Sequence, residues 1–477
     1  MLNKLKACYQ KYALLWLIIA LALLGIVGSR YMVNSAMRAP IEKNLSQPTE
    51  VMPSSSLQSR LALLDLKHWT TDSGARVHYV YSKAIPIVDI EIALDAGAVR
   101  DGKQAGLAYL TNSLLAEGTA QIDANEVAET LETVGAKLST EVYQDMAIVH
   151  IRVLNKPEYI HTALKVVAKI LKQPAFPENG LQRAQQQGLT LLQYEAQRPQ
   201  KIAEKNFYAL LYANHPYGNW PHGTPQTINA ITRKDLLAFH QQYYVTNNLV
   251  VAIVGDIDMA AAKKLAETLT QQLPKGHAAP PLPMPELNQA PLQKHITFPA
   301  KQTHIMLGMP LITRKDPDYF ALYVGNHILG NNGSVSRLFN VIRHEYGLAY
   351  DVHSYLLPMR VPGPYILDLQ TQNSQALPAL KALQHTLAKF IEEGPTVEEL
   401  ANAKQNLLGG FALRFDTNQE IAAAIAMMGF YQLPRDYFDR FMQQIEQVSL
   451  AEIKSAYQQR IDSKNMSVVM IGGGDGL

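Results

Sequence analysis

Apolar and acidic residues alternate along residues 88–95, and this is the clearest local pattern in the chain. Valine, isoleucine and leucine occupy positions 88, 90, 92 and 94, whereas Asp89, Glu91 and Asp95 lie between and after them. A period of two places successive side chains on opposite faces of an extended strand. The pattern therefore predicts a β-strand with one buried face and one face in water.

Other segments show the periods of both helices and strands. Amphipathic helices are expected at 123–134, 157–171 and 321–329, and strands at 146–153 and 249–254. The second of these strands is short and wholly apolar, and it ends at Gly255-Asp256. Helices and strands thus occur together along the whole chain, and we expect an α+β fold.

Two parts of the chain repeat each other in a single register. Residues 231–236 resemble residues 448–453, and each stretch predicts a Ser- or Thr-capped helix that is followed by a strand. In the same register, Asn248 matches Asn465, Val251 matches Val468 and Gly255 matches Gly472. Earlier in each half, residues 202–203 similarly resemble residues 421–422. An internal duplication explains this agreement better than chance does.

Closely spaced prolines separate the two copies. Pro280-Pro281, Pro283 and Pro285 can form neither a helix interior nor a central strand. We therefore expect a linker at 274–292, which joins a domain at 64–273 to a domain at 293–477.

The N-terminus carries a candidate membrane segment. Lys4, Lys6 and Lys11 precede an apolar run at 13–28, and this charge pattern keeps the N-terminus in the cytoplasm. We expect a signal-anchor at 1–30 and a polar tether at 31–63, with a cleaved signal peptide as the alternative. Either outcome places the body outside the cytoplasm, which in a bacterium means the periplasm, with the anchor in the inner membrane.

Composition excludes several classes of function. The net charge of +2 and the absence of basic runs give no reason to expect nucleic acid binding. Cys8 is the only cysteine and precedes the apolar run. The body therefore has no disulfides, thiol catalysis or cysteine-based metal sites.

Residues 106–119 read Gly-Leu-Ala-Tyr-Leu-Thr-Asn-Ser-Leu-Leu-Ala-Glu-Gly-Thr. This stretch resembles the zinc helix of the M16 family of pitrilysin-like and mitochondrial-processing-peptidase-like proteases, written G-L-A-H-x-x-E-H-x-x-x-x-G-T. The positions of the two zinc-binding His and the general-base Glu hold Tyr109, Asn112 and Ser113. Asn, Ser and neutral Tyr are poor zinc ligands, and a carboxamide has no useful pKa for base catalysis.

The family also has a further Glu ligand on a downstream helix. We expect this helix at 182–197, where the matching turn at 189–192 lacks a carboxylate and Glu195 follows about one turn later. With no other ligand beside it, Glu195 is interpreted as an ordinary surface residue. We expect no metal in this chain.

A second motif lies in the later half of the chain. Residues 336–350 resemble the family segment S-R-L-x-x-x-x-R-x-x-x-G-L-A-Y, whose Arg and Tyr bind the substrate backbone and help to hold the tetrahedral intermediate. Arg343 and Tyr350 match these two residues, and a guanidinium and a phenol are suitable donors to an oxyanion. The alternative is a surface ion pair of Arg343 with Glu345 or another acid, with Tyr350 in the core.

Other motifs carry less weight. Residues 330–333, Gly-Asn-Asn-Gly, predict a loop that allows close approach of chain or substrate, and residues 215–218, His-Pro-Tyr-Gly, a structural turn. His222, His327 and His344 are isolated in the sequence and predict no zinc site.

The resemblance implies a fold with two homologous domains of the LuxS/MPP-like metallohydrolase type, each a mainly antiparallel sheet packed with helices. It also implies a non-catalytic subunit, inactive alone, that grips a peptide or unfolded polypeptide through Arg343 and Tyr350. A heterodimer partner from the same family would supply the zinc helix for peptide hydrolysis. One alternative is a membrane-tethered peptide-binding or assembly pseudoprotease, like the core proteins of respiratory complexes. Another is a self-sufficient peptidase with an unrecognised metal site.

Overall fold

The structure is a computed structural model that describes residues 65–286 and 290–473 of the 477-residue chain. The expected signal-anchor at 1–30 and tether at 31–63 lie outside these residues. Within the part that is described, no helix has the length and apolar character needed to cross a membrane.

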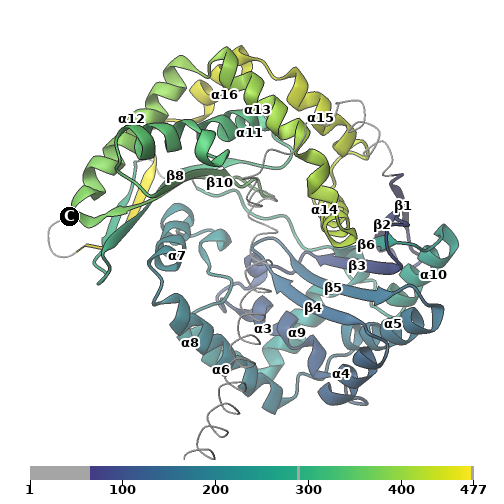
Figure 1. The fold of residues 1–477 in the computed structure, drawn as a ribbon. Helices are drawn as coiled ribbons and strands as arrows, with labels where there is room; N and C mark the ends of the chain where they lie inside the picture. The colour runs from purple at the N-terminus through teal and green to yellow at the C-terminus, as the bar shows by residue number, and fades with distance from the viewer. Residues whose placement is uncertain (1–64, 287–289, 474–477) are drawn as a thin grey trace, which may run out of the picture. The chain divides into compact units, whose positions relative to one another are not determined.

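Two β-sheets organise the described residues (Figure 1). The first has the order β1-β2-β6-β3-β5-β4 and the second the order β7-β11-β8-β10-β9. The strands of the first sheet are β1 (Lys67–Thr70), β2 (Arg76–Tyr81), β3 (Ile87–Leu94), β4 (Lys137–Val142), β5 (Ala147–Leu154) and β6 (Leu249–Gly255). Those of the second are β7 (Gln293–Ile296), β8 (Gln302–Ile312), β9 (Asp351–Leu356), β10 (Gly363–Gln372) and β11 (Ser467–Ile471).

The two sheets share one topology once β1 is set aside. In each, one parallel pair, β2–β6 or β7–β11, is followed by three antiparallel pairs in the same order. The expected α+β class with mainly antiparallel sheets is therefore confirmed, and the common strand order agrees with an internal duplication.

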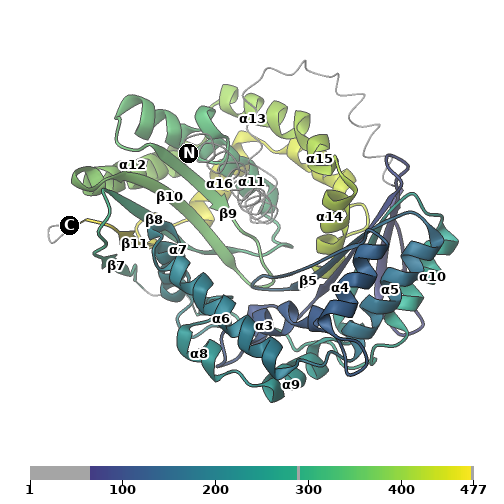
Figure 2. The same cartoon turned by 60° about the horizontal axis from the view of Figure 1, so that its bottom comes forward.

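Helices pack on both sheets and connect their strands (Figure 2). Those in the first half are α3 (Leu107–Ser113), α4 (Ala124–Thr133), α5 (Pro157–Lys172), α6 (Glu178–Glu195), α7 (Pro199–Tyr212), α8 (Pro225–Ala230), α9 (Arg233–Tyr243) and α10 (Met259–Thr270). Those in the second are α11 (Tyr319–Leu329), α12 (Ala376–Glu393), α13 (Val397–Gly409), α14 (Asn418–Phe430), α15 (Tyr437–Gln447) and α16 (Leu450–Arg460).

The repeated helix and strand at the end of each half form as the sequence predicts. Thr232 caps α9 and Ser449 caps α16, and in both cases the acidic residue three positions later completes a capping box. The strands that follow, β6 and β11, are buried along their whole length. Residues 231–255 and 448–472 are thus equivalent in structure as well as in sequence.

The other repeated element, α7 and α14, is exchanged between the halves. α14 packs on β3 and β6 of the first sheet, with Ile425 and Phe430 in a shared apolar cluster. α7 packs on β8 and β11 of the second sheet, with Phe207 and Leu211 buried there. Each sheet therefore completes one of its faces with a helix from the other half.

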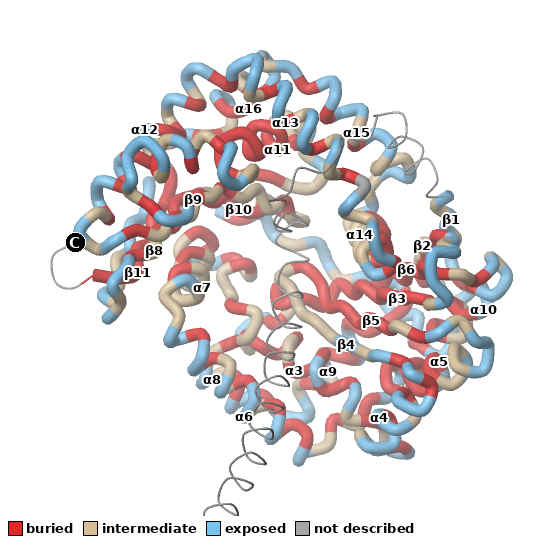
Figure 3. The backbone as a smooth tube through the Cα atoms, in the orientation of Figure 1, coloured by how far each residue is buried: buried red, intermediate tan, exposed pale blue. Residues whose placement is uncertain are grey.

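This exchange corrects the expectation of a wet face on β3. Asp89 is fully buried and Glu91 is 8% exposed, and Figure 3 shows the strand as buried. Asp89 is held there by His150 and Arg152, whose side-chain nitrogens lie within 3.1 Å of its carboxylate oxygens. A sheet face with acidic residues can be covered because α14 brings apolar residues to it and these cross-strand partners satisfy the charge of Asp89.

Candidate functional site

The retained glycines around α3 have structural causes. Gly106 precedes the helix with φ of 96°, and a Cβ there would lie 2.6 Å from Ile228 Cδ1. Gly118 also has φ of 96°, and its Cβ would lie 2.2 Å from the carbonyl oxygen of Ile122. Only glycine fits such positions without strain. The frame of this motif is therefore required by the fold whether or not the helix carries a catalytic site.

Asn112 ties α3 to the first sheet. Its side chain is fully buried, and its Nδ2 donates to the carbonyl oxygens of Glu141 at 2.8 Å and Ile148 at 3.0 Å. Its Oδ1 accepts from the hydroxyl of Tyr244 at 3.0 Å. The two bonds from Nδ2 require the NH₂ group of an amide, whereas Oδ1 is an acceptor that an amide and a carboxylate share. A carboxylate at this position would place an oxygen opposite two carbonyl oxygens.

Tyr109 and Ser113 also have local surroundings unlike a metal site. The ring of Tyr109 packs edge-on against His222, with 5.1 Å between ring centroids, and lies beside Gly188 of α6. Ser113 is exposed, and its hydroxyl donates to the carbonyl oxygen of Leu110 at 3.1 Å. Ser113 is the last residue of the short helix α3.

Glu195 is not the surface residue that the sequence suggests. It is 8% exposed, and its carboxylate accepts from Trp220 Nε1 and pairs with His222 Nδ1, both at 2.8 Å. Burial acts to raise the pKa of Glu195, but the hydrogen bonds from His222 and Trp220 and the charges of His222 and Lys201 hold it below its ordinary value. These partners lie 25 and 27 residues away in sequence, and for this reason local pattern did not reveal them.

The residues at this place do not fit a zinc ion. Zinc in proteins takes at least three His, Cys, Asp or Glu ligands in a tetrahedral shell, and the described residues contain no group of three that could hold a metal. Glu195 and His222 form a pair, and the neighbouring motif positions supply a phenol, a bonded amide and a hydroxyl. No chemical step through a metal follows from this arrangement.

The second motif, in contrast, brings its two key residues together, with Arg343 half-buried and Tyr350 exposed. Arg343 lies in a π-helix, η6 (Phe339–Glu345), and Tyr350 precedes β9. The guanidinium carbon of Arg343 is 4.6 Å from the ring centroid of Phe339 and 4.7 Å from that of Tyr350. The guanidinium carbon thus lies over two aromatic rings at cation–π distance, and these contacts position the group.

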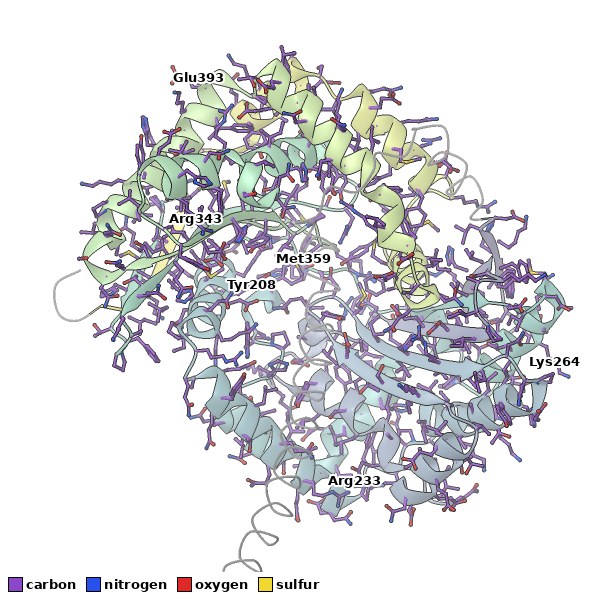
Figure 4. The ribbon with its side chains drawn as sticks, viewed as in Figure 1. Tyr208, Arg233, Lys264, Arg343, Met359 and Glu393 are labelled. Atoms are coloured by element: carbon purple, nitrogen blue, oxygen red, sulfur yellow. The ribbon has the colours of Figure 1, made fainter. Side chains whose placement is uncertain are left out.

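This geometry tests the alternative in which Arg343 forms a surface ion pair and Tyr350 lies in the core. Tyr350 is 71% exposed, so its assignment to the core is wrong. The Arg343 guanidinium contacts the two rings, and it also acts on Asp351, whose pKa is held below its ordinary value by the hydrogen bond and charge of His353 and by the charge of Arg343. Its labelled side chain is visible in Figure 4. Sequence reasoning missed Phe339, although a spacing of four residues on a helical segment is a signal that could have found it.

A separate ion pair fixes the start of this segment. Arg337 pairs with Glu399 of α13 and stacks on Phe390 of α12, with 4.8 Å between its guanidinium carbon and the ring centroid. Gly330 approaches Ser354 of β9 so closely that a Cβ would lie 2.5 Å from the hydroxyl oxygen, as expected for a loop of close approach. The two motifs belong to different sheets: α3 packs on β4 and β5, and η6 packs on β9 and α12.

His215, His327 and His344 form hydrogen bonds or ring contacts with neighbouring residues. His215 accepts from the backbone N–H of Tyr217 in a short 3₁₀ turn, as predicted. His327 is buried with its Nε2 3.1 Å from Asn406 Oδ1, and burial lowers its pKa to about 4. His344 is exposed and packs edge-on against Phe339.

The sequence and the fold of this chain match those of a known protein family. Residues 76–224 match the model for insulinase, peptidase family M16, and residues 230–407 match the model for the peptidase M16 inactive domain. A crystal structure of a peptidase M16 inactive domain from Pseudomonas fluorescens is 35% identical, with a TM-score of 0.83, and the match covers 86% of this chain and 98% of that one.

Two bacterial relatives extend the match over most of the chain. The non-peptidase homolog YmxG of Helicobacter pylori is 27% identical over 401 residues, or 83% of this chain and 92% of the relative. The uncharacterized zinc protease YmxG of Bacillus subtilis is 24% identical over 359 residues, or 75% of this chain and 86% of the relative. The repeated α+β topology, the altered helix α3 and these matches together show that the chain belongs to the M16 peptidase family.

Proposed function

We propose that this chain is the non-catalytic, peptide-binding subunit of a two-chain M16 protease. A homologous partner with an intact H-x-x-E-H helix would hold the zinc ion and the general base. This chain would contribute Arg343 and Tyr350 to the substrate at the partner's site. In this proposal the body lies in the bacterial periplasm and is held at the inner membrane by residues 13–28.

The observation that carries the proposal is the stacked guanidinium of Arg343. Its guanidinium carbon lies over the rings of Phe339 and Tyr350, and its charge also acts on Asp351. Cation–π contacts position the group without using its N–H donors. A preorganised donor of this kind stabilises a peptide carbonyl or a developing oxyanion because little reorganisation is needed when the charge appears. Tyr350 adds an exposed hydroxyl beside it.

The state of α3 supports the non-catalytic part of the proposal. Asn112 uses both its donors and its acceptor within the core, and the name of the Helicobacter pylori relative describes that protein as a non-peptidase. The attachment of Arg343 to the second sheet, away from α3, suits a residue that acts on another chain's zinc site.

The test is reconstitution with a homologue that carries the intact zinc helix, encoded in the same genome. We expect each chain alone to leave a quenched fluorescent peptide intact and the mixture to cleave it. Arg343→Ala should lower the cleavage rate of the mixture about 100-fold, the cost of removing one oxyanion donor. The matched control is Arg440→Ala, because Arg440 is an exposed arginine that pairs only with Asp436 on its own helix.

The outcomes separate the proposal from its rivals. An inactive mixture, or an Arg343→Ala mixture as active as the control, contradicts the proposal. Peptide binding by this chain alone in fluorescence anisotropy, with no active mixture, would instead favour the membrane-tethered binding or assembly protein. Cleavage by this chain alone together with stoichiometric zinc would favour a self-sufficient peptidase.

A further inference from the structure

A pocket of about 400 Å³ lies where four segments of the chain meet. Its wall includes Arg314 and Lys315 after β8, Arg360 in the loop between β9 and β10, and Phe430 and Tyr431 at the end of α14. Met359, labelled in Figure 4, also lines it. The pocket therefore combines three cations with aromatic and apolar side chains.

The positive charge of this pocket is only partly balanced. Arg360 Nη1 lies 3.0 Å from Asp95 Oδ2, but Asp95 is also held by two nitrogens of Arg100 at 2.8 and 2.9 Å. Burial acts to lower the pKa of Arg314, but the phenols of tyrosines 319, 431 and 437 hold it above its ordinary value, and tyrosines 431 and 437 also form hydrogen bonds with its side chain. Arg100 and Arg360 thus share Asp95, and Arg360 also faces the buried Asp145, which accepts from its backbone N–H at 3.0 Å. Arg314 and the exposed Lys315 have no salt bridge among the described residues.

The guanidinium groups are also short of hydrogen-bond partners. The Nε atoms of Arg314 and Arg360 are buried and have none among the described residues. Both guanidinium carbons lie over aromatic rings, Arg360 over Phe430 at 4.2 Å and Arg314 over Tyr431 at 5.2 Å from the ring centroid. The hydroxyl of Tyr431 in turn donates to Asp145 at 2.8 Å. Buried donors and charges without partners cost free energy, which an anion bound at the pocket would recover.

We propose that this pocket binds the carboxylate group of an organic ligand through Arg314, Arg360 and Lys315. A planar carboxylate matches the fork of a guanidinium with two parallel hydrogen bonds, and the apolar lining accommodates the carbon skeleton attached to it. The C-terminus of a peptide and a small free carboxylic acid share this chemistry. The proposal is independent of Arg343 and of any zinc-bearing partner.

The test uses the full chain and two fluorescent peptides of one sequence that differ only in ending with a carboxylate or a carboxamide. Succinate and inorganic phosphate serve as competitors in anisotropy titrations. If the natural ligand is a peptide C-terminus, the peptide that ends in a carboxylate should bind at least about ten-fold tighter than the peptide that ends in a carboxamide. If it is a small acid, succinate should bind and be detected by thermal stabilisation of the chain. Equal binding of both peptides with no effect of succinate, or tighter binding of phosphate than of any carboxylate, overturns the proposal.

Variants locate the binding. Arg314→Lys keeps the charge but loses the fork and should weaken carboxylate binding about ten-fold, whereas Lys315→Gln should weaken it a few-fold. Lys389→Gln is the matched control because Lys389 is an exposed lysine on α12. If Arg314→Lys does not fold, as judged by its denaturation midpoint, the carboxylate affinities of Arg360→Lys and Lys315→Gln are used to test the proposal instead. Unchanged carboxylate binding in both overturns the proposal.

Discussion

Helix α3 and the segment from η6 to β9 both match a motif of one family, yet the chain uses them differently. In α3, Asn112 is fully buried and is consumed by three hydrogen bonds within the fold. In the second segment, Tyr350 is 71% exposed, and Arg343 contacts two aromatic rings and acts on the charge of Asp351. The polar groups of Asn112 are used within the core, whereas Tyr350 presents its side chain to solvent.

This difference separates two reasons why a motif is retained. Gly106 and Gly118 are needed by the backbone, so the frame around α3 says little about function. The 71% exposed side chain of Tyr350 is not held by the core in the same way. The role proposed for Arg343 and Tyr350 is therefore tested through activity, not through stability.

The largest effect is expected at Asn112. Asn112→Asp places a carboxyl group of the same shape against two carbonyl oxygens and should reduce the free energy of unfolding by about 3 kcal/mol at pH 7. The pKa of the new carboxyl would be raised in the folded state, so the loss should be small below about pH 4 and grow as the pH rises. Urea denaturation at several pH values measures this. Ser113→Ala is the control, and a change in Asn112→Asp no larger than the control's would show that α3 is not tied to the sheet.

A smaller effect, on function alone, is expected at Tyr350. In the reconstituted two-chain protease, Tyr350→Phe keeps the ring that stacks on Arg343 but removes the hydroxyl, and peptide cleavage should fall about ten-fold. Stability should change by less than about 0.5 kcal/mol because the side chain is exposed. Tyr346→Phe controls for the loss of a neighbouring phenol that is 54% exposed. Equal rates for the two variants would remove Tyr350 from the proposed site.

The smallest effect is expected at Glu195. Its pKa is held below the ordinary value in the fold, so its ionised form stabilises the protein above about pH 4.3, and this contribution is lost as the pH falls through the folded pKa. Glu195→Gln should therefore cost about 1 kcal/mol at pH 7, discounted because His222 is partly exposed. The difference from the unmodified protein should vanish in acid. Glu393→Gln, an exposed carboxylate on α12, should show no such pH dependence in the same denaturation series.

Local pattern predicted the elements of this fold well because their causes are local. The strand at 249–254 and the helices at 123–134 and 157–171 appear within one or two residues of their expected bounds. The capped helices after Thr232 and Ser449 follow from side chains only three residues apart.

Features that depend on distant partners could not be predicted in this way. The acidic face of β3 alternates like a solvated strand, and its burial depends on α14, which begins more than 300 residues later. Glu195 likewise depends on Trp220 and His222. The carboxylate pocket gathers Arg314, Arg360 and Tyr431 from segments that no sequence period connects.

The exchange of α7 and α14 has a consequence for synthesis of the chain. The first sheet emerges from the ribosome complete in its strands once residue 255 has been made, but the helix that covers β3 and β6 ends only at Phe430. Domains usually fold in order as they are made. Here the earlier half must wait with an apolar surface uncovered until most of the later half exists. A nascent chain paused between these points would be a natural client for a holding chaperone.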